Sequence, residues 1–249
     1  MGAWQHGREL NLKGPKQRTM FAALLLNGGE VVPDQQLTEL LWGEAPPATS
    51  IAQIHTYASR IRRQLGETVS IDRNYSGYLM RVHDARIDLA EFEARTRFGR
   101  AALRLGRRGE GVRWLRSALA LWRGPALSNV TEHLTKVEAP RLEEERLTVL
   151  STRIEAELAL GAHARMIPEL VDLVVRYPLQ ESFRAQLMVA FHRDGRPEDA
   201  LAVYENGRRL LAEELGIDPG PFLRSVYEAL LSPGRAPTAA AGPLTYVEI

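Results

Sequence analysis

The segment Thr49–Leu65, TSIAQIHTYASRIRRQL, gives the strongest indication of a fold in this sequence. Ser50 and Gln53 have the Ser-x-x-Gln spacing of a capping box, which predicts that a helix begins here. Apolar residues then recur at steps of three and four along one stripe, formed by Ile51, Ile54, Ala58, Ile61 and Leu65. The pattern predicts a helix that buries this stripe and exposes its opposite face.

The opposite face of the predicted helix carries small polar side chains and arginines. Its members are Gln53, His55, Thr56, Ser59, Arg60, Arg62 and Arg63. No acidic residue lies between Glu44 and Glu67 to neutralise them. Short polar groups suit base edges and guanidiniums suit phosphates or guanine, as in a helix that reads the major groove. An ordinary amphipathic helix with a solvated basic face has the same pattern, so the flanking segments decide between the two.

The flanking segments predict a winged helix. In order, they are a short hairpin within residues 1–13, a helix from Gly14-Pro15 to Gly28-Gly29, a short helix from Pro33-Asp34 to Gly43, and, after the Thr49–Leu65 helix, strands at Val69–Asp72 and Tyr78–Val82 with a five-residue turn between them. Three helices followed by a β-hairpin form the winged variant of the helix-turn-helix. Residues 1–83 are therefore predicted to be a winged helix-turn-helix DNA-binding domain of α+β type.

Cations outside the Thr49–Leu65 helix extend the predicted DNA interface. Lys16 and Arg18 lie in the first turn of the first helix, where the helix dipole disfavours positive charge unless a phosphate binds there. Surface solubility explains this pair equally well. Arg73 is the only cation in the predicted hairpin turn, and Asn74 and Tyr75 beside it carry groups that can meet phosphates or sugars.

From Asp84 onward the strand pattern ends and amphipathic helices follow one another. They are predicted at Leu89–Leu105, Gly109–Leu121, Ala139–Leu160, His163–Tyr177, Glu181–Arg193, Pro197–Leu215 and Pro219–Leu231. Gly161 and Gly195 lie 34 residues apart at similar helix–helix turns, which is the tetratricopeptide period. Residues 84–231 are therefore predicted to form a tetratricopeptide-like array of about three helix pairs.

Within the later repeat, small and aromatic packing positions fall at Ala200, Tyr204 and Gly207. Residues 232–249 are rich in Pro, Ala and Gly, which predicts a flexible tail or linker. The fold class is thus mainly α, with the winged helix-turn-helix first and an all-α domain after it. Helix arrays of this kind present grooves to protein partners and rarely carry out chemistry.

Composition excludes several classes of protein. The 249 residues suffice for one large domain or two modest ones, and the net charge is +1. Residues 1–83 hold 9 Lys and Arg against 7 Asp and Glu, so DNA binding has to come from local placement of charge. There is no cysteine, hence no disulfide and no thiolate zinc site. No signal-peptide core or membrane-length apolar run is present, and a soluble, cytoplasmic protein is expected.

No catalytic, metal or cofactor site is predicted. The six histidines are scattered without ligand spacing, and no phosphate-binding loop or nucleophile motif occurs. The run Glu143-Glu144-Glu145 is interpreted as a solvated helix surface, because consecutive helical residues point in different directions. The four tryptophans are interpreted as core residues; they are Trp4, Trp42, Trp114 and Trp122.

Several stretches occur in the same order as in one known family. In the first part they are GPKQRTMFAALLLNGGEVV, LTELLWGEAPPATS and IHTYASRIRRQLG. In the second part they are DLAEFEARTRFGRAAL, LEEERLTVLSTRIEAELALGAHARMIPELV, YPLQESFRAQLMVAF and GRPEDALAVYENGRRLLAEELGIDPGP. Over about residues 3–231 the chain resembles the Streptomyces antibiotic regulatory proteins. Its first part is similar to their OmpR-type winged-helix domain and its second to their bacterial transcriptional activation domain.

The resemblance implies a transcriptional activator of a secondary-metabolite gene cluster. It implies double-stranded DNA with direct repeats near the promoter −35 region as the target. The implied assembly is a head-to-tail dimer on DNA, with RNA polymerase and its sigma factor as partners, and no enzymatic activity, cofactor or membrane. The family usually begins with an additional strand before the part that matches Met1–Gly14, and here that strand is short or missing.

Two alternatives to an activator of this kind stay open. In the first, the chain is a tetratricopeptide-like adaptor whose winged helix makes only protein contacts and does not read DNA. In the second, the chain is the N-terminal part of a larger regulator, because larger family members carry an ATPase module after the helical domain. Binding to duplex DNA and its dependence on salt separate the adaptor from the activator.

Overall fold

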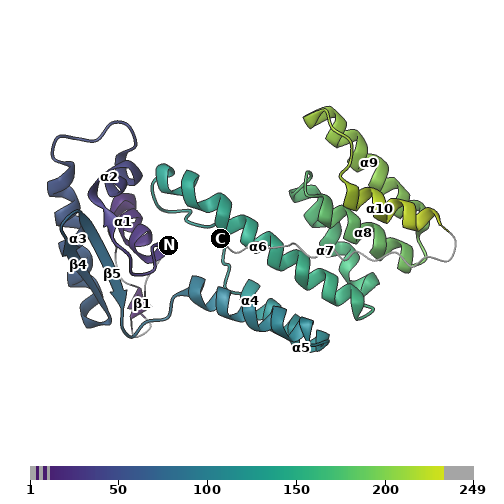
Figure 1. The fold of residues 1–249 in the computed structure, drawn as a ribbon, viewed down its shortest axis with the longest axis horizontal. Helices are drawn as coiled ribbons and strands as arrows, with labels where there is room; N and C mark the ends of the chain where they lie inside the picture. Colours follow the sequence, from purple (N-terminus) through teal and green to yellow (C-terminus); the bar gives the residue numbers. More distant parts are fainter. Residues whose placement is uncertain (1–3, 6–7, 10–11, 233–249) are drawn as a thin grey trace. The chain divides into compact units, whose positions relative to one another are not determined.

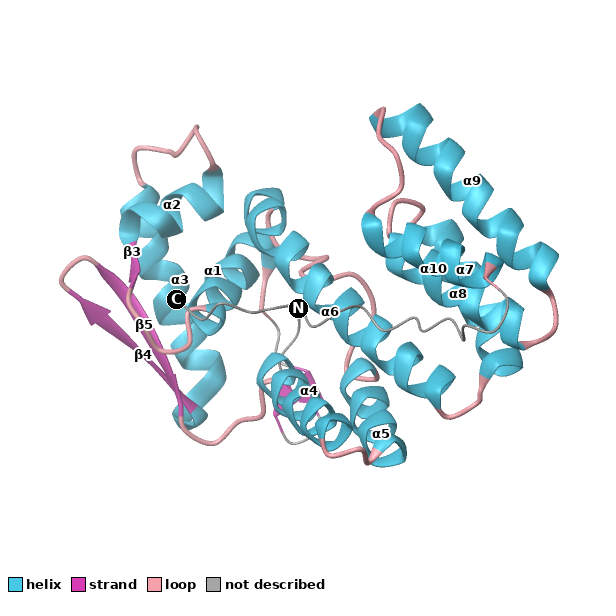
Figure 2. Ribbon diagram, turned by 45° about the vertical axis from the view of Figure 1, so that its right-hand side comes forward, coloured by secondary structure: helices cyan, strands magenta, loops and turns pink. Residues whose placement is uncertain are grey.

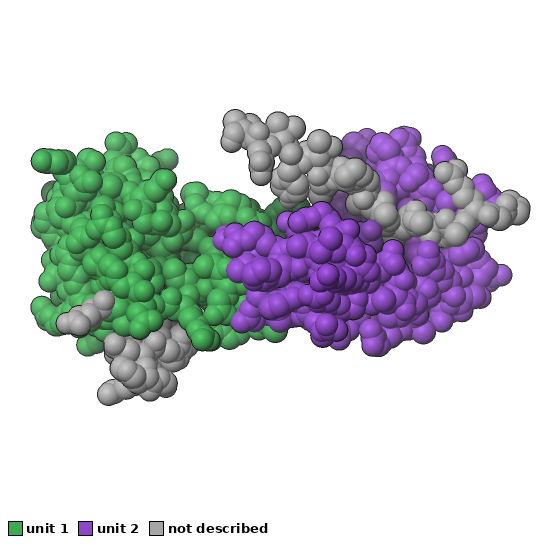
Figure 3. Space-filling view, turned by 60° about the horizontal axis from the view of Figure 1, so that its bottom comes forward, with its two compact units in different colours: residues 1–92, 120–147 green, residues 93–119, 148–249 purple. Residues whose placement is uncertain are grey.

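The computed structural model describes residues 4–5, 8–9 and 12–232. Its contacts divide it into two compact units, each built from two separate parts of the chain. The first unit combines Met1–Phe92 with Ala120–Leu147, and the second combines Glu93–Leu119 with Thr148–Ile249 (Figure 3). Two helices, α4 (Asp88–Arg104) and α6 (Glu132–Ala159), contribute residues to both units.

The first unit contains a winged helix (Figures 1 and 2). In chain order, the elements of residues 4–82 are β1 (Trp4–Gln5), β2 (Arg8–Glu9), α1 (Gly14–Leu26), β3 (Val32–Pro33), α2 (Asp34–Trp42), α3 (Ser50–Leu65), a 3₁₀ turn (Gly66–Thr68), β4 (Val69–Asn74) and β5 (Gly77–Val82). Strands β3, β5 and β4 form an antiparallel sheet in that order, and β1 pairs with β2. The predicted winged helix-turn-helix and the predicted N-terminal hairpin are confirmed.

Helix α3 buries most of its predicted stripe, but its start differs from the prediction. Ile54, Ala58, Ile61 and Leu65 are buried, whereas Ile51 is 44% exposed beside the loop that precedes the helix. The N-cap residue is Thr49, and Ser50 is already helical. The amide Nε2 of Gln53 donates to the Thr49 hydroxyl at 3.0 Å. The predicted capping box at Ser50 is therefore wrong, because the N-cap lies one residue earlier and its side chain makes no capping hydrogen bond.

The wing has a tighter turn than predicted. Arg73 lies opposite Tyr78 in the β4–β5 ladder and Asn74 opposite Gly77, which leaves two residues in the loop. Arg73 is thus a strand residue, and its prediction as a turn residue is wrong. Gly77 permits this arrangement, because a Cβ atom there would lie 2.1 Å from the carbonyl oxygen of Val32 on β3. Strand β3 can pair with β5 at this point because Gly77 has no side chain.

The core of the first unit extends beyond the winged helix. Leu134, from the segment 120–147, is 1% exposed and belongs to the same buried cluster as the apolar faces of α1, α2 and α3. The backbone N–H of Thr131 donates to the Thr19 hydroxyl at 2.8 Å, and its own hydroxyl donates to the carbonyl of Leu40 at 2.6 Å. Residue 84 marks the end of the strand pattern, but packing of the first unit continues to residue 147.

Helix α6 is longer than its sequence pattern indicates. The sequence pattern predicts a helix over Ala139–Leu160. It begins at Glu132 instead and continues through Pro140. The expected start is wrong, since a proline inside a helix removes one hydrogen bond without always ending the helix.

The second unit is helical throughout its described part. Besides its shares of α4 and α6 it contains α5 (Arg108–Leu119), α7 (His163–Arg176), α8 (Glu181–Arg193), α9 (Pro197–Leu215) and α10 (Pro221–Leu231). The predicted packing residues Ala200, Tyr204 and Gly207 are buried. Gly161 and Gly195 both have positive φ angles, of 84° and 76°, at the turns where glycine was expected.

Helices α4 and α5 approach each other closely through two glycines. A Cβ atom on Gly99 would lie 2.7 Å from the Leu115 side chain, and one on Gly111 would lie 2.5 Å from the Leu103 side chain. Each glycine thus accommodates a leucine from the other helix. Trp114 on α5 is 37% exposed, so its interpretation as a core residue is wrong. Trp42 and Trp122 are half-buried, and the Trp4 side chain lies outside the described residues.

A buried ion cluster connects α5, α6 and α7. The carboxylate of Glu157, whose side chain is 1% exposed, accepts hydrogen bonds from Arg116, Arg153 and Arg165 at 2.6–3.0 Å. Arg153, which is also buried, pairs in addition with Glu169. Burial alone would raise the pKa of Glu157, but the hydrogen bonds and charges of Arg116 and Arg153 lower it below its ordinary value.

Candidate nucleic-acid interface

The outward face of α3 presents a compact set of polar side chains. His55, Thr56, Ser59, Arg60 and Arg63 are all exposed, because burial of the opposite stripe fixes the rotation of the helix. The β4–β5 hairpin lies beside α3 in both views (Figures 1 and 2). Helix and wing together therefore form one polar surface on the first unit.

Two arginines on this face are available to a ligand. Among the described residues, Arg60 and Arg63 make no hydrogen bond or ion pair, and the Ser59 hydroxyl also has no partner. The Thr56 hydroxyl donates to the carbonyl of Ala52 at 2.9 Å, which leaves its oxygen free to accept. Guanidiniums and small hydroxyls in this arrangement can bind phosphates and the base edges of a duplex.

Arg62 is also exposed, but its guanidinium contacts the sheet. Its Nε donates to the carbonyl of Ile71 on β4, and its guanidinium lies 5.8 Å from the centre of the Tyr78 ring. His55 meets the same ring edge-on at 6.0 Å. Tyr78 is 3% exposed, and burial raises the pKa of its hydroxyl. Tyr78 is therefore a contact point between α3 and the wing.

Arg73 also points back into the fold. Its guanidinium donates to both carboxylate oxygens of Asp34, at 2.6 and 2.7 Å, and lies 5.0 Å from the Tyr78 ring centre. The hydrogen bond to Asp34 raises the pKa of Arg73. No local sequence pattern indicates this pair, because its members are 39 residues apart. Asp34 and Tyr78 are thus residues of the candidate site that sequence reasoning missed.

The tip of the wing is open to solvent. Asn74 is exposed, and its Oδ1 accepts from the backbone N–H of Tyr75 at 2.7 Å. Tyr75 is fully exposed, with a relative accessibility of 103%. An exposed tyrosine hydroxyl at a hairpin tip can contact the sugar-phosphate backbone.

Three other predicted contact residues have partners inside the first unit. The Lys16 ammonium lies 4.8 Å from the ring centre of Trp42. Arg18 donates from Nε to the carbonyl of Asn129 at 2.7 Å and from Nη1 to the carbonyl of Leu12 at 3.1 Å. The Gln53 amide contacts Thr49, as described above, and its Oε1 accepts from the Tyr57 hydroxyl. The structure therefore explains Lys16, Arg18 and Gln53 by contacts within the chain.

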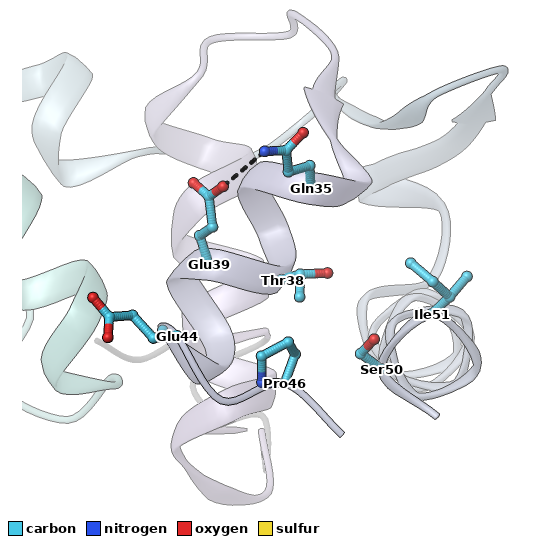
Figure 4. Close-up of a pocket in the computed structure, with 8 residues that line it drawn as sticks. Gln35, Thr38, Glu39, Glu44, Pro46, Ser50 and Ile51 are labelled. Atoms are coloured by element: carbon cyan, nitrogen blue, oxygen red, sulfur yellow. Dashed lines mark hydrogen bonds between the residues drawn. The ribbon is translucent and has the colours of Figure 1, made fainter. Parts of the chain in front are cut away.

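A surface hollow lies between α2 and the beginning of α3 (Figure 4). Its volume is about 670 Å³, and its lining residues are Gln35, Thr38, Glu39, Gly43, Glu44, Pro46, Ser50 and Ile51. Within it Gln35 Nε2 donates to Glu39 Oε1 at 3.0 Å. The carboxylates of Glu39 and Glu44 would repel phosphate, so the hollow is not included in the candidate DNA surface.

The described residues give no sign of two other kinds of site. None of their histidine, aspartate and glutamate side chains gather into a group that could hold a metal ion. None of the helices in this part of the chain combines the length and apolarity needed to cross a bilayer.

Comparison with known proteins assigns the chain to a family. A family model described as "Transcriptional regulatory protein, C terminal" matches residues 7–77, and one described as "Bacterial transcriptional activator domain" matches residues 87–231. Regulatory protein DnrI of Streptomyces peucetius is 36% identical over 240 residues, which are 92% of this chain and 88% of DnrI. The chain belongs to the Streptomyces antibiotic regulatory protein family.

Other members of this family are longer than the chain. Regulatory protein AfsR of Streptomyces griseus is 39% identical over 232 residues, 92% of this chain but 23% of AfsR. The chain thus spans about a quarter of the length of that relative. A solved structure of Mycobacterium tuberculosis EmbR in complex with a low affinity phosphopeptide superposes with a TM-score of 0.84 at 33% identity. The superposition covers 90% of this chain and 61% of that one.

Proposed function

We propose that the chain is a sequence-specific, DNA-binding transcriptional activator whose helix α3 reads the major groove. The observation that carries the proposal is the outward face of α3. Arg60, Arg63 and Ser59 are exposed there and have no partner among the described residues, while the opposite stripe is buried. The proposal is also supported by the similarity to AfsR and DnrI, which are named as regulatory proteins. Thr56 and His55 complete the reading face, and Asn74 and Tyr75 contact the backbone from the wing.

The proposed target is double-stranded DNA with direct repeats at the promoter of a secondary-metabolite gene cluster. Two copies in the same orientation lie about one helical turn apart on such repeats. The second unit is proposed to help recruit RNA polymerase and its sigma factor. Its described residues carry no metal-binding cluster, and its stacked helices provide extended surfaces for protein contact.

Arg60 and Arg63 provide the direct test of the reading helix. We expect Arg60→Ala and Arg63→Ala each to weaken specific binding by about 1–3 kcal/mol, because each removes a guanidinium from the groove without touching the core. Nuclease footprinting on the DNA that flanks the chain's own gene locates the operator, and gel shifts on it measure the affinities. Arg86→Ala is the matched control, since Arg86 is exposed after the wing and outside α3.

Two results would contradict the proposal. Unchanged affinity for both variants would show that α3 does not enter the groove. Absence of any salt-dependent binding to duplex DNA would favour the alternative, an adaptor whose winged helix serves protein contacts.

A further inference from the structure

Two exposed surfaces of the second unit have opposite charge, and both combine it with apolar side chains. The basic surface lies on α4 and α5, and consists of Arg97, Arg104, Arg113, Phe98, Leu105 and Trp114. The acidic surface lies where α9 leads to α10, and consists of Glu213, Glu214, Asp218, Leu215 and Ile217. Figures 1 and 2 show α4–α5 and α9 on opposite sides of α7 and α8. Neither surface belongs to the proposed DNA interface.

The basic surface is strongly charged and apolar at once. Residues 93–119 contain eight arginines and two glutamates. Arg97, Arg104 and Arg113 are exposed and have no hydrogen bond or ion pair among the described residues. The rings of Phe98 and Trp114 lie 5.3 Å apart and are 58% and 37% exposed. The exposed parts of both rings are left uncovered by the described part of the chain.

The acidic surface has charges that the fold does not compensate. Glu213 and Glu214 occupy the last turn of α9, where the helix dipole disfavours negative charge. Together with Asp218 they are exposed and lack an ion-pair partner in the described part of the chain. Leu215 and Ile217 beside them are 52% and 50% exposed. A cation supplied from outside this chain would relieve the unfavourable placement.

The occupant that matches both surfaces is a second copy of the chain. DNA phosphates would pair with the arginines of the basic surface, but they would leave its aromatic rings unused and the acidic surface without a partner. We propose that the acidic surface of one copy docks on the basic surface of the next. Arginines then meet carboxylates, while Leu215 and Ile217 pack against Phe98 and Trp114. This inference rests on the proposed function, because neighbouring DNA sites bring the two copies together.

The positions of the two surfaces decide the symmetry of the assembly. They lie on opposite sides of α7 and α8, so one partner copy cannot cover both at once, and the contact is heterologous and repeats head to tail. Each exposed ion pair contributes little in water, so free copies associate weakly. Two copies held on adjacent sites have a high effective concentration, and the same contact then becomes effective.

Charge reversal tests the proposed contact. The variants are Arg97→Glu with Arg104→Glu on the basic surface, and Glu213→Arg with Glu214→Arg on the acidic one. Gel shifts on one-site and two-site DNA give the single-site affinity and the cooperativity. We expect each double variant to reduce cooperativity about tenfold with single-site affinity unchanged, and the chain carrying all four changes to regain it within about twofold. Arg176→Glu on α7 is the matched control and should leave cooperativity unchanged.

A crosslinking experiment supplies a readout that does not depend on DNA affinity. The chain has no cysteine, so Ala101→Cys beside the basic surface and Ala212→Cys beside the acidic one are the only thiols in a mixture of the two variants. On two-site DNA we expect a disulfide-linked heterodimer, and charge reversal should abolish it. The same mixture without DNA, at a protein concentration on the order of 100 µM, should give the heterodimer in lower yield.

The outcomes separate this inference from the proposed function. If specific single-site binding is intact but reversal leaves both cooperativity and crosslinking unchanged, the docking is wrong and another occupant, such as polymerase, covers the basic surface. Failure of the combined variant to regain cooperativity overturns it as well. If no specific DNA is bound at all, the proposed function fails, and the absence or presence of the DNA-free heterodimer still decides the docking.

Discussion

Arg73 and Asp34 form a bidentate ion pair that joins strand β4 of the wing to the first residue of α2. The two hydrogen bonds measure 2.6 and 2.7 Å. Paired bonds of this kind fix orientation as well as distance. An arginine that the sequence suggests as a phosphate contact therefore holds the wing in place in the structure.

We expect Arg73→Ala and Asp34→Asn to weaken DNA binding by similar factors, and the double variant to be no worse than either alone. The reason is that each change releases the wing from α2. The stability change should be small, about 1 kcal/mol or less, because the Arg73 side chain is 38% exposed and solvent screens the pair. Gel shifts and thermal melts measure both effects. A loss with Arg73→Ala that Asp34→Asn does not reproduce would show that Arg73 contacts DNA directly.

Glu157 should be the most sensitive charged residue of the second unit. We expect Glu157→Gln to destabilise the protein by about 1–3 kcal/mol, because Arg116, Arg153 and Arg165 lose the buried carboxylate that they share, while Arg153 keeps its pair with Glu169. Glu155→Gln is the matched control on the same helix. Burial raises the pKa of Glu155, so removing its charge should be neutral or slightly stabilising. Equal losses for the two variants in urea unfolding would count against this account of the cluster.

The same carboxylate predicts how stability depends on pH. The pKa of Glu157 is lower in the folded chain than its ordinary value of 4.5, so the unfolded chain takes up the proton first as pH falls. The stability it contributes is complete above about pH 4.5 and is lost as pH falls through the folded pKa. Urea midpoints at neutral pH and at about pH 4 should therefore differ more for the unmodified chain than for Glu157→Gln.

The close approach of α4 and α5 can be tested with one methyl group. Gly111→Ala places a Cβ atom 2.5 Å from the Leu103 side chain and 3.1 Å from the Gly99 carbonyl oxygen. We expect a loss of about 1–3 kcal/mol, because the helices have to separate. Gly109→Ala on the same helix meets nothing within 4 Å and should stabilise by about 0.4–1 kcal/mol. A neutral Gly111→Ala in denaturant titrations would mean that the helices can part freely.

Leu134 should influence DNA binding although it lies far from α3 in sequence. We expect Leu134→Ala to destabilise the first unit by about 2–5 kcal/mol, since this side chain is 1% exposed within the winged-helix core. Val137→Ala, at a position 63% exposed on the same helix, is the control and should have little effect. A fragment of residues 1–83 lacks Leu134, so it should melt at a lower temperature than the first unit does within the full chain. A fragment as stable as the full chain would show that residues 120–147 are dispensable.

Local pattern was sufficient to predict most of the helices and strands, although not the first two turns of α6. The apolar stripe of α3, the alternation of the wing strands and the glycine punctuation of α7–α9 each depend on residues close in sequence. Helices α8 and α9 have the bounds that the sequence predicted. Ile51 departs from the stripe, because the neighbouring loop does not cover the first turn of α3.

Side-chain partners could not be predicted in the same way. Arg18 bonds to a carbonyl 111 residues away and Arg73 to a carboxylate 39 residues away, and no local pattern encodes such distances. Exposed arginines therefore looked alike in the sequence, whereas the structure separates Arg60 and Arg63 from those with partners inside the fold. Trp114 was assigned to the core by its apolar periodic context, yet its ring lies at the surface.

The contribution of Leu134 and Thr131 to the winged-helix core has a consequence for synthesis on the ribosome. The wing is complete at about residue 83, but the first unit gains its last segment only at residue 147, which is 64 residues later. At about 5–20 residues per second, translation of that interval takes about 3–13 s. During this time the nascent winged helix exposes the apolar surface that Leu134 later covers. A chaperone that recognises short apolar segments should therefore bind stalled chains that end between these two positions, and release chains that extend beyond the second.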